Sequence, residues 1–350
     1  MKKVFALVMA AALALSLVAC GGSDSDSSSA STPASQAASS AADSVASTVP
    51  AGGKVGVCIY KFDDNFMTVY RNKLEEILTS KGYEVTFQDG NNDQVKQTEQ
   101  INTYITQGVD ALIINPVMTS AAEQIVDLVK TAGIPTVLIN REPTEGEMAV
   151  YDKIAYVGCD AAQSGTYQGE LILETENKGD INGDGVVSYI MIQGDPENVD
   201  AQLRTEYSVK ALEDAGVKVE QLDMQRGDWD QNKGQEICAT DLSKFGDKVE
   251  VVFCNNDAMA LGALEAIKTA GRTVGKDIYL VGVDALDDAL DKIQAGEMTG
   301  TVLNDADAQA TKAVEVMEAL LGGKTYTADE QQIYVDYVKV TPDNVADFVK

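Results

Sequence analysis

The chain has 350 residues, 45% of them hydrophobic, which is enough for two domains of ordinary size with substantial cores. Its 55 Asp and Glu outnumber 27 Lys and Arg, so the formal net charge is −28, which argues against nucleic acid or an anionic membrane surface as a partner. The chain has no histidine, which excludes Ser-His-Asp and Cys-His catalysis, His-ligated zinc and a histidine pH switch.

The first 19 residues have the pattern of a signal peptide. Two lysines precede an apolar stretch (residues 4–17) that is short for a membrane span. The sequence LVAC at residues 17–20 then matches a lipobox, which predicts cleavage before Cys20 and a lipid on its thiol. The alternative is an ordinary signal peptide that ends near a cysteine. We therefore expect a protein anchored by Cys20 to the extracytoplasmic face of the cell membrane.

Residues 20–53 are rich in Ser and Ala and predict a disordered tether, because such a segment buries too little apolar area to offset its chain entropy. Four cysteines follow the tether, and we expect them to be free thiols packed as small apolar groups, although an exported protein could pair them. They are Cys58, Cys159, Cys238 and Cys254.

From residue 54 onward, apolar runs alternate with amphipathic segments. Strands are predicted at 55–60, 83–88, 111–115, 136–140, 154–158, 187–193, 217–222, 249–255, 278–284, 299–303 and 333–338. Helices are predicted at 66–80, 95–107, 121–132, 161–176, 201–215, 231–244, 258–270, 285–295 and 308–321. Continuous apolar strands are typical of parallel sheets covered by helices on both faces. The pattern predicts an α/β protein with two doubly wound parallel-sheet lobes.

Polar residues follow many of these strands, at the carboxyl ends where such sheets bind ligands. They are Asp63, Asp64, Asn140, Asn255, Asn256, Asp284 and Asn304. Taken singly, each is more simply a helix cap or a turn residue, and Asp257 is interpreted as a cap. The sequence contains no Gly-x-Gly-x-x-Gly after a strand and no Gly-x-x-x-x-Gly-Lys-Ser/Thr. It therefore gives no support for a dinucleotide-binding or phosphate-binding loop.

Four further residues extend this set toward carbohydrate chemistry: Phe66, Asp200, Arg204 and Trp229. A sugar is a ring of hydroxyl groups with two apolar faces, so its recognition combines fixed carboxylates and amides with aromatic rings. Trp229 is the only tryptophan and lies in the polar stretch 226–230, so we expect it to face a cleft.

Residues 180–188 have the spacing of a calcium loop. Oxygen ligands fall at positions 1, 3, 5, 7 and 9, namely Asp180, Asn182, Asp184, the Val186 carbonyl and Ser188. Gly185 supplies the sharp turn at position 6, but position 12 is Met191 and not the usual glutamate. A carboxylate from elsewhere would have to complete the site. The alternative is a metal-free turn rich in Asp, Asn and Gly.

Several stretches resemble the family of periplasmic galactose/glucose-binding proteins, from about residue 54 to the C-terminus. They are 59–67, 151–158, the loop 180–188, 254–260, 282–286 and 300–306. The resemblance implies a type I periplasmic-binding-protein fold, in which two lobes are joined by a three-segment hinge. The N-terminal lobe would comprise 54–158 and 305–338, and the C-terminal lobe 159–304 and 339–350.

The resemblance also implies the roles of individual residues. The sugar would be hydrogen-bonded by Asp64, Asn140, Asp200, Arg204, Asn256, Asp284 and Asn304, and stacked by Phe66 and Trp229. Asn198 stands where the family has a histidine that bonds the sugar. Glu250 would supply the missing carboxylate to a structural Ca²⁺, whereas Ser188 is shorter than the family's glutamine.

The function that follows is capture of a hexose, a monosaccharide of the galactose/glucose type, by closure of the two lobes. A monomeric protein would then deliver the sugar to a membrane permease of the ATP-binding-cassette (ABC) type, without covalent chemistry. One alternative is a sensor that presents the sugar to a chemoreceptor or sensor kinase. Another is a glycosidase that uses Asp64 and Asp284. A transcription regulator of the lac-repressor type is disfavoured by the export signal and by the lack of a basic helix-turn-helix.

Overall fold

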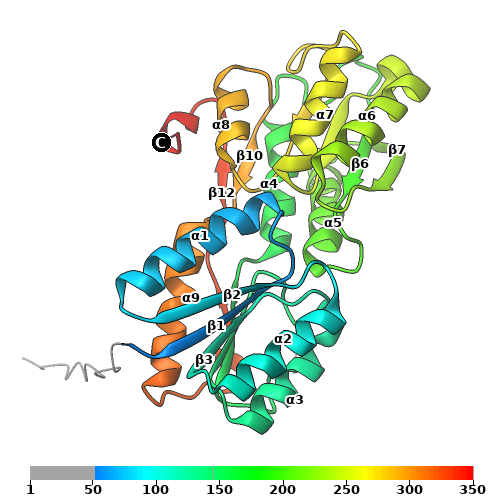
Figure 1. The fold of residues 1–350 in the computed structure, drawn as a ribbon. Helices are drawn as coiled ribbons and strands as arrows, with labels where there is room; N and C mark the ends of the chain where they lie inside the picture. The colour runs from blue at the N-terminus through cyan, green and yellow to red at the C-terminus, as the bar shows by residue number, and fades with distance from the viewer. Residues whose placement is uncertain (1–51, 145, 350) are drawn as a thin grey trace, which may run out of the picture. The chain divides into compact units, whose positions relative to one another are not determined.

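The computed structural model describes residues 52–144 and 146–349 (Figure 1). The predicted signal peptide, the predicted lipidation site Cys20 and all but the last two residues of the predicted tether lie outside the described residues. Between residues 52 and 349, no helix is long and apolar enough to cross a membrane.

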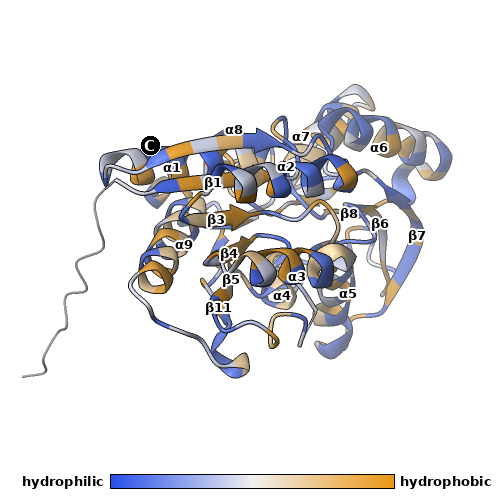
Figure 2. Ribbon diagram, turned by 60° about the horizontal axis from the view of Figure 1, so that its bottom comes forward, coloured by the Kyte–Doolittle hydropathy of each residue, from blue (hydrophilic) through white to orange (hydrophobic). Residues whose placement is uncertain are grey.

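The first lobe is built on a six-stranded parallel sheet with strand order β11-β5-β4-β3-β1-β2. Its strands are β1 (Lys54–Ile59), β2 (Glu84–Asp89), β3 (Ala111–Ile114), β4 (Thr136–Ile139), β5 (Ile154–Gly158) and β11 (Gln332–Tyr334). Its helices are α1 (Asn65–Ser80), α2 (Gln94–Gln107), the 3₁₀ turn η1 (Thr119–Ala121), α3 (Ala122–Ala132), α9 (Ala306–Leu321) and the 3₁₀ turn η3 (Ala328–Glu330). The central strands β3 and β4 are fully buried and hydrophobic (Figure 2).

Alternating side chains of the strands contribute to two separate hydrophobic cores in this lobe, one on each face of the sheet. Val55 and Val57 of β1 pack with α1 and α9, whereas Cys58, between Val57 and Ile59, packs with α2 and α3. This division follows from the two-residue period of a strand. Helices on both faces explain why the strands are apolar without alternation, as the sequence predicted.

The second lobe is built on a four-stranded parallel sheet with order β7-β6-β8-β9. Its strands are β6 (Val187–Gln193), β7 (Val219–Arg226), β8 (Val251–Cys254) and β9 (Tyr279–Val281), beside the antiparallel pair β10 (Thr301–Leu303) and β12 (Val338–Val340). Its helices are α4 (Ala161–Leu173), α5 (Val199–Asp214), α6 (Gln231–Phe245), α7 (Asp257–Thr269) and α8 (Asp287–Gln294), with the 3₁₀ turns η2 (Gly246–Lys248) and η4 (Val345–Asp347). The expected α/β architecture with two parallel sheets is confirmed.

One predicted strand is wrong. Residues 333–338 were expected to form a single strand, but they are divided between β11 in the first sheet and β12 beside β10. The chain between them leaves one sheet for the other: Val335 N donates to Gly158 O at 2.8 Å, and Tyr337 N donates to the Gln163 side chain at 2.8 Å. Hydrophobicity alone does not reveal this change of partner.

Three chain segments connect the lobes. They lie between β5 and α4, between β10 and α9, and between β11 and β12. Strand β7 also runs longer than expected, to Arg226, because an edge strand bonds to one neighbour only and tolerates exposed polar residues.

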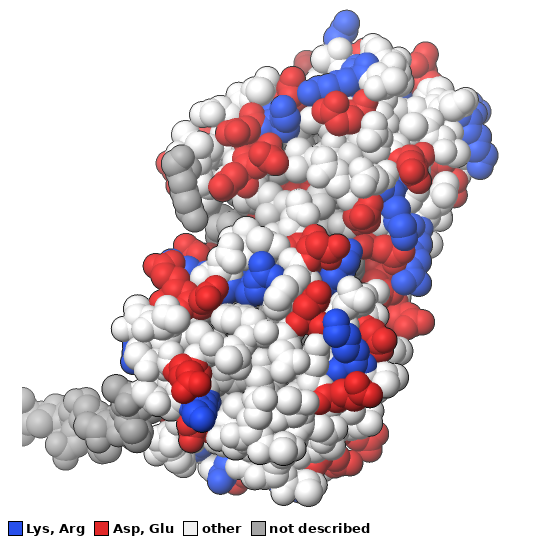
Figure 3. All heavy atoms as spheres, in the orientation of Figure 1, with Lys and Arg blue, Asp and Glu red and all other residues white. Residues whose placement is uncertain are grey.

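The predicted free cysteines are confirmed, since Cys58, Cys159, Cys238 and Cys254 are all buried and unpaired. Burial raises the pKa of the Cys58 thiol to about 12, so it packs as a neutral apolar group. On the outer surface, basic and acidic side chains lie interspersed on the face shown in Figure 3.

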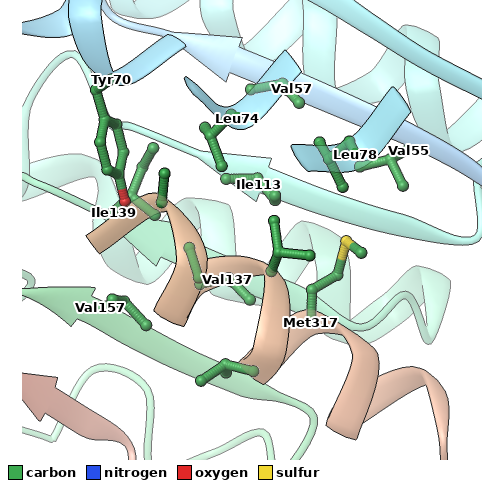
Figure 4. Close-up of a cluster of buried hydrophobic side chains, with 14 of the residues drawn as sticks. Val55, Val57, Tyr70, Leu74, Leu78, Ile113, Val137, Ile139, Val157 and Met317 are labelled. Atoms are coloured by element: carbon green, nitrogen blue, oxygen red, sulfur yellow. The ribbon is translucent and has the colours of Figure 1, made fainter. Parts of the chain in front are cut away.

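Leu74 of α1 lies against β1 and β3, close to Val57 and Ile113, and is completely buried (Figure 4). We expect Leu74→Ala to lower the free energy of unfolding by about 2–5 kcal/mol, because the cavity cannot be refilled. Val95→Ala, at a position that is 71% exposed, is the control and should change it by less than about 0.5 kcal/mol. Urea unfolding followed by circular dichroism measures both; equal effects would contradict the packing described.

Candidate functional site

A polar pocket lies where the carboxyl ends of both sheets face each other. All ten sequence-predicted binding residues line it: Asp64, Phe66, Asn140, Asn198, Asp200, Arg204, Trp229, Asn256, Asp284 and Asn304. Three lining residues were not predicted, namely Tyr60, Met67 and Arg141. Each is next to, or a few residues from, a predicted one, so a search of every residue after a strand end would have found Tyr60 and Arg141.

On the first lobe, Asp64 is held in place from two directions. Its Oδ1 accepts from Met67 N at 2.7 Å and so caps α1, and its Oδ2 accepts from the Tyr60 hydroxyl at 2.6 Å. The guanidinium of Arg141 lies 3.8 Å from the centre of the Tyr60 ring and donates to Val117 O. Burial, and then the Asp64 carboxylate, raise the pKa of Tyr60 well above its usual value, so the hydroxyl remains a donor.

On the second lobe, helix α5 presents Asn198, Asp200 and Arg204. Asn198 Oδ1 caps the helix by accepting from Asp200 N at 3.0 Å, and the spacing of four residues places Asp200 and Arg204 on one face. Arg204 donates to Asn255 O at 2.8 Å and to the Tyr337 hydroxyl at 3.0 Å, and its Nη2 lies 3.4 Å from Asp200 Oδ2.

Two buried atoms of this group have no hydrogen-bond partner, Asp200 Oδ1 and Arg204 Nε. Burial raises the pKa of Asp200, against the opposing effect of Arg204. A buried acceptor and a buried donor without partners are each costly, typically by about 1–3 kcal/mol. A ligand with a donor for Asp200 Oδ1 and an acceptor for Arg204 Nε would remove both costs.

Asp284 and Asn304 form the wall beside the connecting segments. Asn304 Nδ2 donates to Asp284 Oδ1 at 3.2 Å, and Asn304 Oδ1 accepts from Gln309 Nε2 at 2.6 Å. Burial raises the pKa of Asp284 well above its usual value, and Arg204 opposes that shift. The backbone of Asp284 has φ = 126°, a strained value that is characteristic of functional sites.

Trp229 is partly buried and faces the pocket, as the sequence predicted. Its backbone has φ = 64°, in the left-handed region, and its carbonyl accepts from Asn256 Nδ2 at 3.3 Å. A Cβ at Gly194 would lie 2.3 Å from the indole ring, so only glycine lets the ring lie there. Asn256 therefore holds the backbone of Trp229, and the absence of a side chain at Gly194 leaves room for its ring.

Three of the predicted binding residues are helix caps as well: Asp64 of α1, Asn198 of α5 and Asn256 of α7. The sequence left open whether such residues are helix caps or pocket residues, and these three are both. The interpretation of Asp257 as a cap is wrong, because Asn256 caps α7 and the Asp257 carboxylate accepts from Thr301 Oγ1 at 2.6 Å and from Leu286 N at 2.9 Å.

The predicted calcium residues lie together on the second lobe. Glu250, which is buried, accepts from Asn182 N at 2.9 Å and from Ser188 N at 2.8 Å, so it joins both ends of the loop. The Asp180 carboxylate accepts from the loop amides of residues 183–185. Within the described residues no three Asp, Glu, Cys or His side chains converge closely enough to hold a metal.

The chemistry of this loop nevertheless suits a hard cation. Its donors are all oxygen, as calcium prefers. None of Asp180, Asp184 and Glu250 makes an ion pair with a Lys or Arg of the described chain, so their negative charges have no other counter-ion there. Calcium binding remains a prediction.

Two α/β lobes that enclose one polar pocket define a two-lobed solute-binding protein. The chain belongs to the periplasmic binding protein family, whose domain matches residues 55–325. The prediction of a binding protein without enzymatic activity is thereby confirmed. Its relatives include the D-galactose/methyl-galactoside binding periplasmic protein of Haemophilus influenzae, 36% identical over 86% of this chain and 93% of that protein.

Two further similarities are more distant. The ribose import binding protein of Bacillus subtilis is 29% identical over 77% of this chain and 82% of that protein. An ABC transporter solute-binding protein from Bacillus halodurans, solved with bound myo-inositol, has a TM-score of 0.74 and 29% identity, and the match covers 85% of this chain and 98% of that one. The resemblance to this family that the sequence indicated is confirmed.

Burial raises the pKa of Asp257 to about 6, from an ordinary 3.8. The pKa of this carboxyl is higher in the folded protein than in the unfolded chain. As the pH rises from about 4 to about 6, the unfolded chain loses its proton first, and the free energy of unfolding falls. The loss amounts to about 3 kcal/mol. We expect the stability of Asp257→Asn not to show this fall. In thermal unfolding from pH 4 to pH 7, the stability of the variant should therefore rise relative to that of the wild type. A constant difference between the two proteins would contradict this assignment.

Proposed function

We propose that the protein binds a neutral hexose of the galactose/glucose type in the pocket and delivers it to an ABC permease. Its family and its sugar-binding relatives support a sugar as the ligand. The observation that carries the proposal is the pair of buried atoms without partners, Asp200 Oδ1 and Arg204 Nε. A sugar hydroxyl is both donor and acceptor, so the hydroxyl groups of a sugar suit either atom.

The charges in the pocket favour a neutral ligand. Its three carboxylates, Asp64, Asp200 and Asp284, are nearly balanced by the guanidinium groups of Arg141 and Arg204. The carboxylates accept from hydroxyl groups, and the amides of the pocket can donate and accept. Charged partners make stronger bonds than neutral ones and select against a ligand that lacks the hydroxyl group.

Aromatic side chains suit the apolar faces of the ring. Phe66 comes from the first lobe and Trp229 from the second, and both line the pocket. A sugar between them would be held by both lobes and would stabilise the closed protein.

Closure is the step that captures the ligand. Thr119 Oγ1 of the first lobe donates to Glu197 O of the second at 3.2 Å, and the pocket retains only about 30 Å³. That volume holds about one or two water molecules, so the lobes have to separate to admit a sugar ring. The three connecting segments would act as the hinge.

The choice of a hexose rests on the relative named for galactose and on the predicted residues. The relative named for ribose and the structure solved with myo-inositol are less similar in sequence. The Oδ1 of Asn198 is occupied by the helix cap, so this residue offers the sugar its Nδ2 as a donor. A histidine at this place could accept as well, and we therefore expect the preference among epimers to differ from that of relatives with histidine.

The proposal also covers where the protein lies in the cell and what attaches it there. We propose a lipid on Cys20 that holds the chain to the extracytoplasmic face of the membrane, beside its permease. The lipobox supports the anchor, and the family supports an extracytoplasmic location.

Titration of the intrinsic Trp229 fluorescence with galactose, glucose, ribose and myo-inositol tests the ligand. We expect a saturable change with galactose or glucose at the lowest concentrations. Asp200→Asn should weaken binding by about 2–5 kcal/mol, at least a 30-fold loss of affinity, because Arg204 is left without its counter-charge.

The matched control is Asp214→Asn, an exposed carboxylate on the same helix, which should bind as the wild type does. Absence of any response to galactose and glucose would overturn the hexose. Equal affinity of the Asp200→Asn variant and the wild type would overturn the role of this group.

We also propose that the loop 180–188 and Glu250 hold a structural Ca²⁺. Calcium at 100 times its Kd should stabilise the protein by about 3 kcal/mol, seen as a higher Tm than with a chelator. Glu250→Gln should abolish the difference, whereas Glu75→Gln, at an exposed position of α1 in the other lobe, should keep it. A Tm that is the same with calcium and with chelator in the wild type would show that the loop is a metal-free turn.

A further inference from the structure

A second cavity, here called the outer cavity, lies beside the sugar pocket and has a volume of about 230 Å³. Both lobes line it, the first with Tyr60 and Arg141 and the second with Arg226, Asp228, Trp229 and Lys233 among others. Tyr60, Arg141 and Trp229 line the sugar pocket too, so the two cavities share a wall.

The difference in size between the two cavities limits where parts of a ligand can go. The sugar pocket is closed down to about 30 Å³ around its polar groups, whereas the outer cavity remains open when the lobes are close together. The sugar ring itself enters the pocket only when the lobes open. A group attached to the ring on the side of the shared lining residues would extend into the outer cavity, which already has room for it.

The lining of the outer cavity is polar and nearly balanced in charge. Arg226 lies 3.3 Å from Asp195 and also pairs with Asp228, which pairs with Lys233. Because these charges are already paired, the cavity gives no strong preference for an ionic group. It offers closely spaced donors and acceptors beside the rings of Tyr60 and Trp229, which is the combination that a sugar requires.

We infer that the protein also takes hexoses that carry a polar substituent of about one sugar unit, with the hexose in the pocket and the substituent in the outer cavity. This inference rests on the proposed function. Arg226 provides the means to test it, because it lines the outer cavity and is absent from the walls of the sugar pocket.

The experiment measures the affinities of the full chain for galactose, glucose, lactose and melibiose by calorimetry and Trp229 fluorescence. We expect at least one disaccharide to bind within about tenfold of the better monosaccharide. Arg226→Ala should weaken that disaccharide at least about fivefold and change the monosaccharide less than twofold. Lys210→Ala, which removes a similarly exposed cation paired with Asp214, is the control and should change neither affinity.

The outcomes separate this inference from the proposed function. If a monosaccharide binds and neither disaccharide does, the inference is overturned and the proposed function stands. The inference is also overturned if Arg226→Ala affects the disaccharide no more than the monosaccharide. If no sugar of either size binds, both fail.

Discussion

Parallel strands place all their carboxyl ends at one edge of a sheet, and in this protein the edges of both sheets face the same pocket. The site depends on this constraint. Asp64 and Asn140 follow strands of the first sheet, and Asn256 and Asp284 follow strands of the second. Residues that are far apart in the chain thus meet without any long loop to carry them, and each one is fixed to a rigid element.

Several helix-capping residues also line the pocket. A strand that ends at the pocket is followed by a helix, and the first amides of that helix lie near the pocket. The side chain that caps those amides therefore lies at the pocket wall. Asp64, Asn198 and Asn256 each use one oxygen for the cap. The remaining polar atom of Asp64 pairs with Tyr60 and that of Asn256 with the Trp229 carbonyl, so these two caps also position aromatic residues of the pocket wall. Capping also restricts the rotamer, which lowers the entropy lost when a ligand binds.

The buried charges of the site are costly to keep without a ligand. Asp200 and Asp284 have raised pKa values because they are buried, and Arg204 offsets this only in part. A ligand that offers hydrogen-bond partners to these groups would recover part of that cost. The hydrophobic cores of the two lobes offset this cost, and the first of them extends to the pocket through Tyr60, Phe66 and Met67.

The sequence by itself determined the α/β alternation, the parallel sheets and most of the predicted residues of the pocket wall, because strand ends and periodicity are local properties of the chain, whereas Asn198 came only from the resemblance to the family. It also indicated the family. Only the tertiary structure decided contacts between distant residues. It placed Arg141 on Tyr60, joined Arg204 to Tyr337, divided residues 333–338 between two sheets, and left two buried atoms without partners. Such contacts depend on which elements become neighbours, and no local pattern records that.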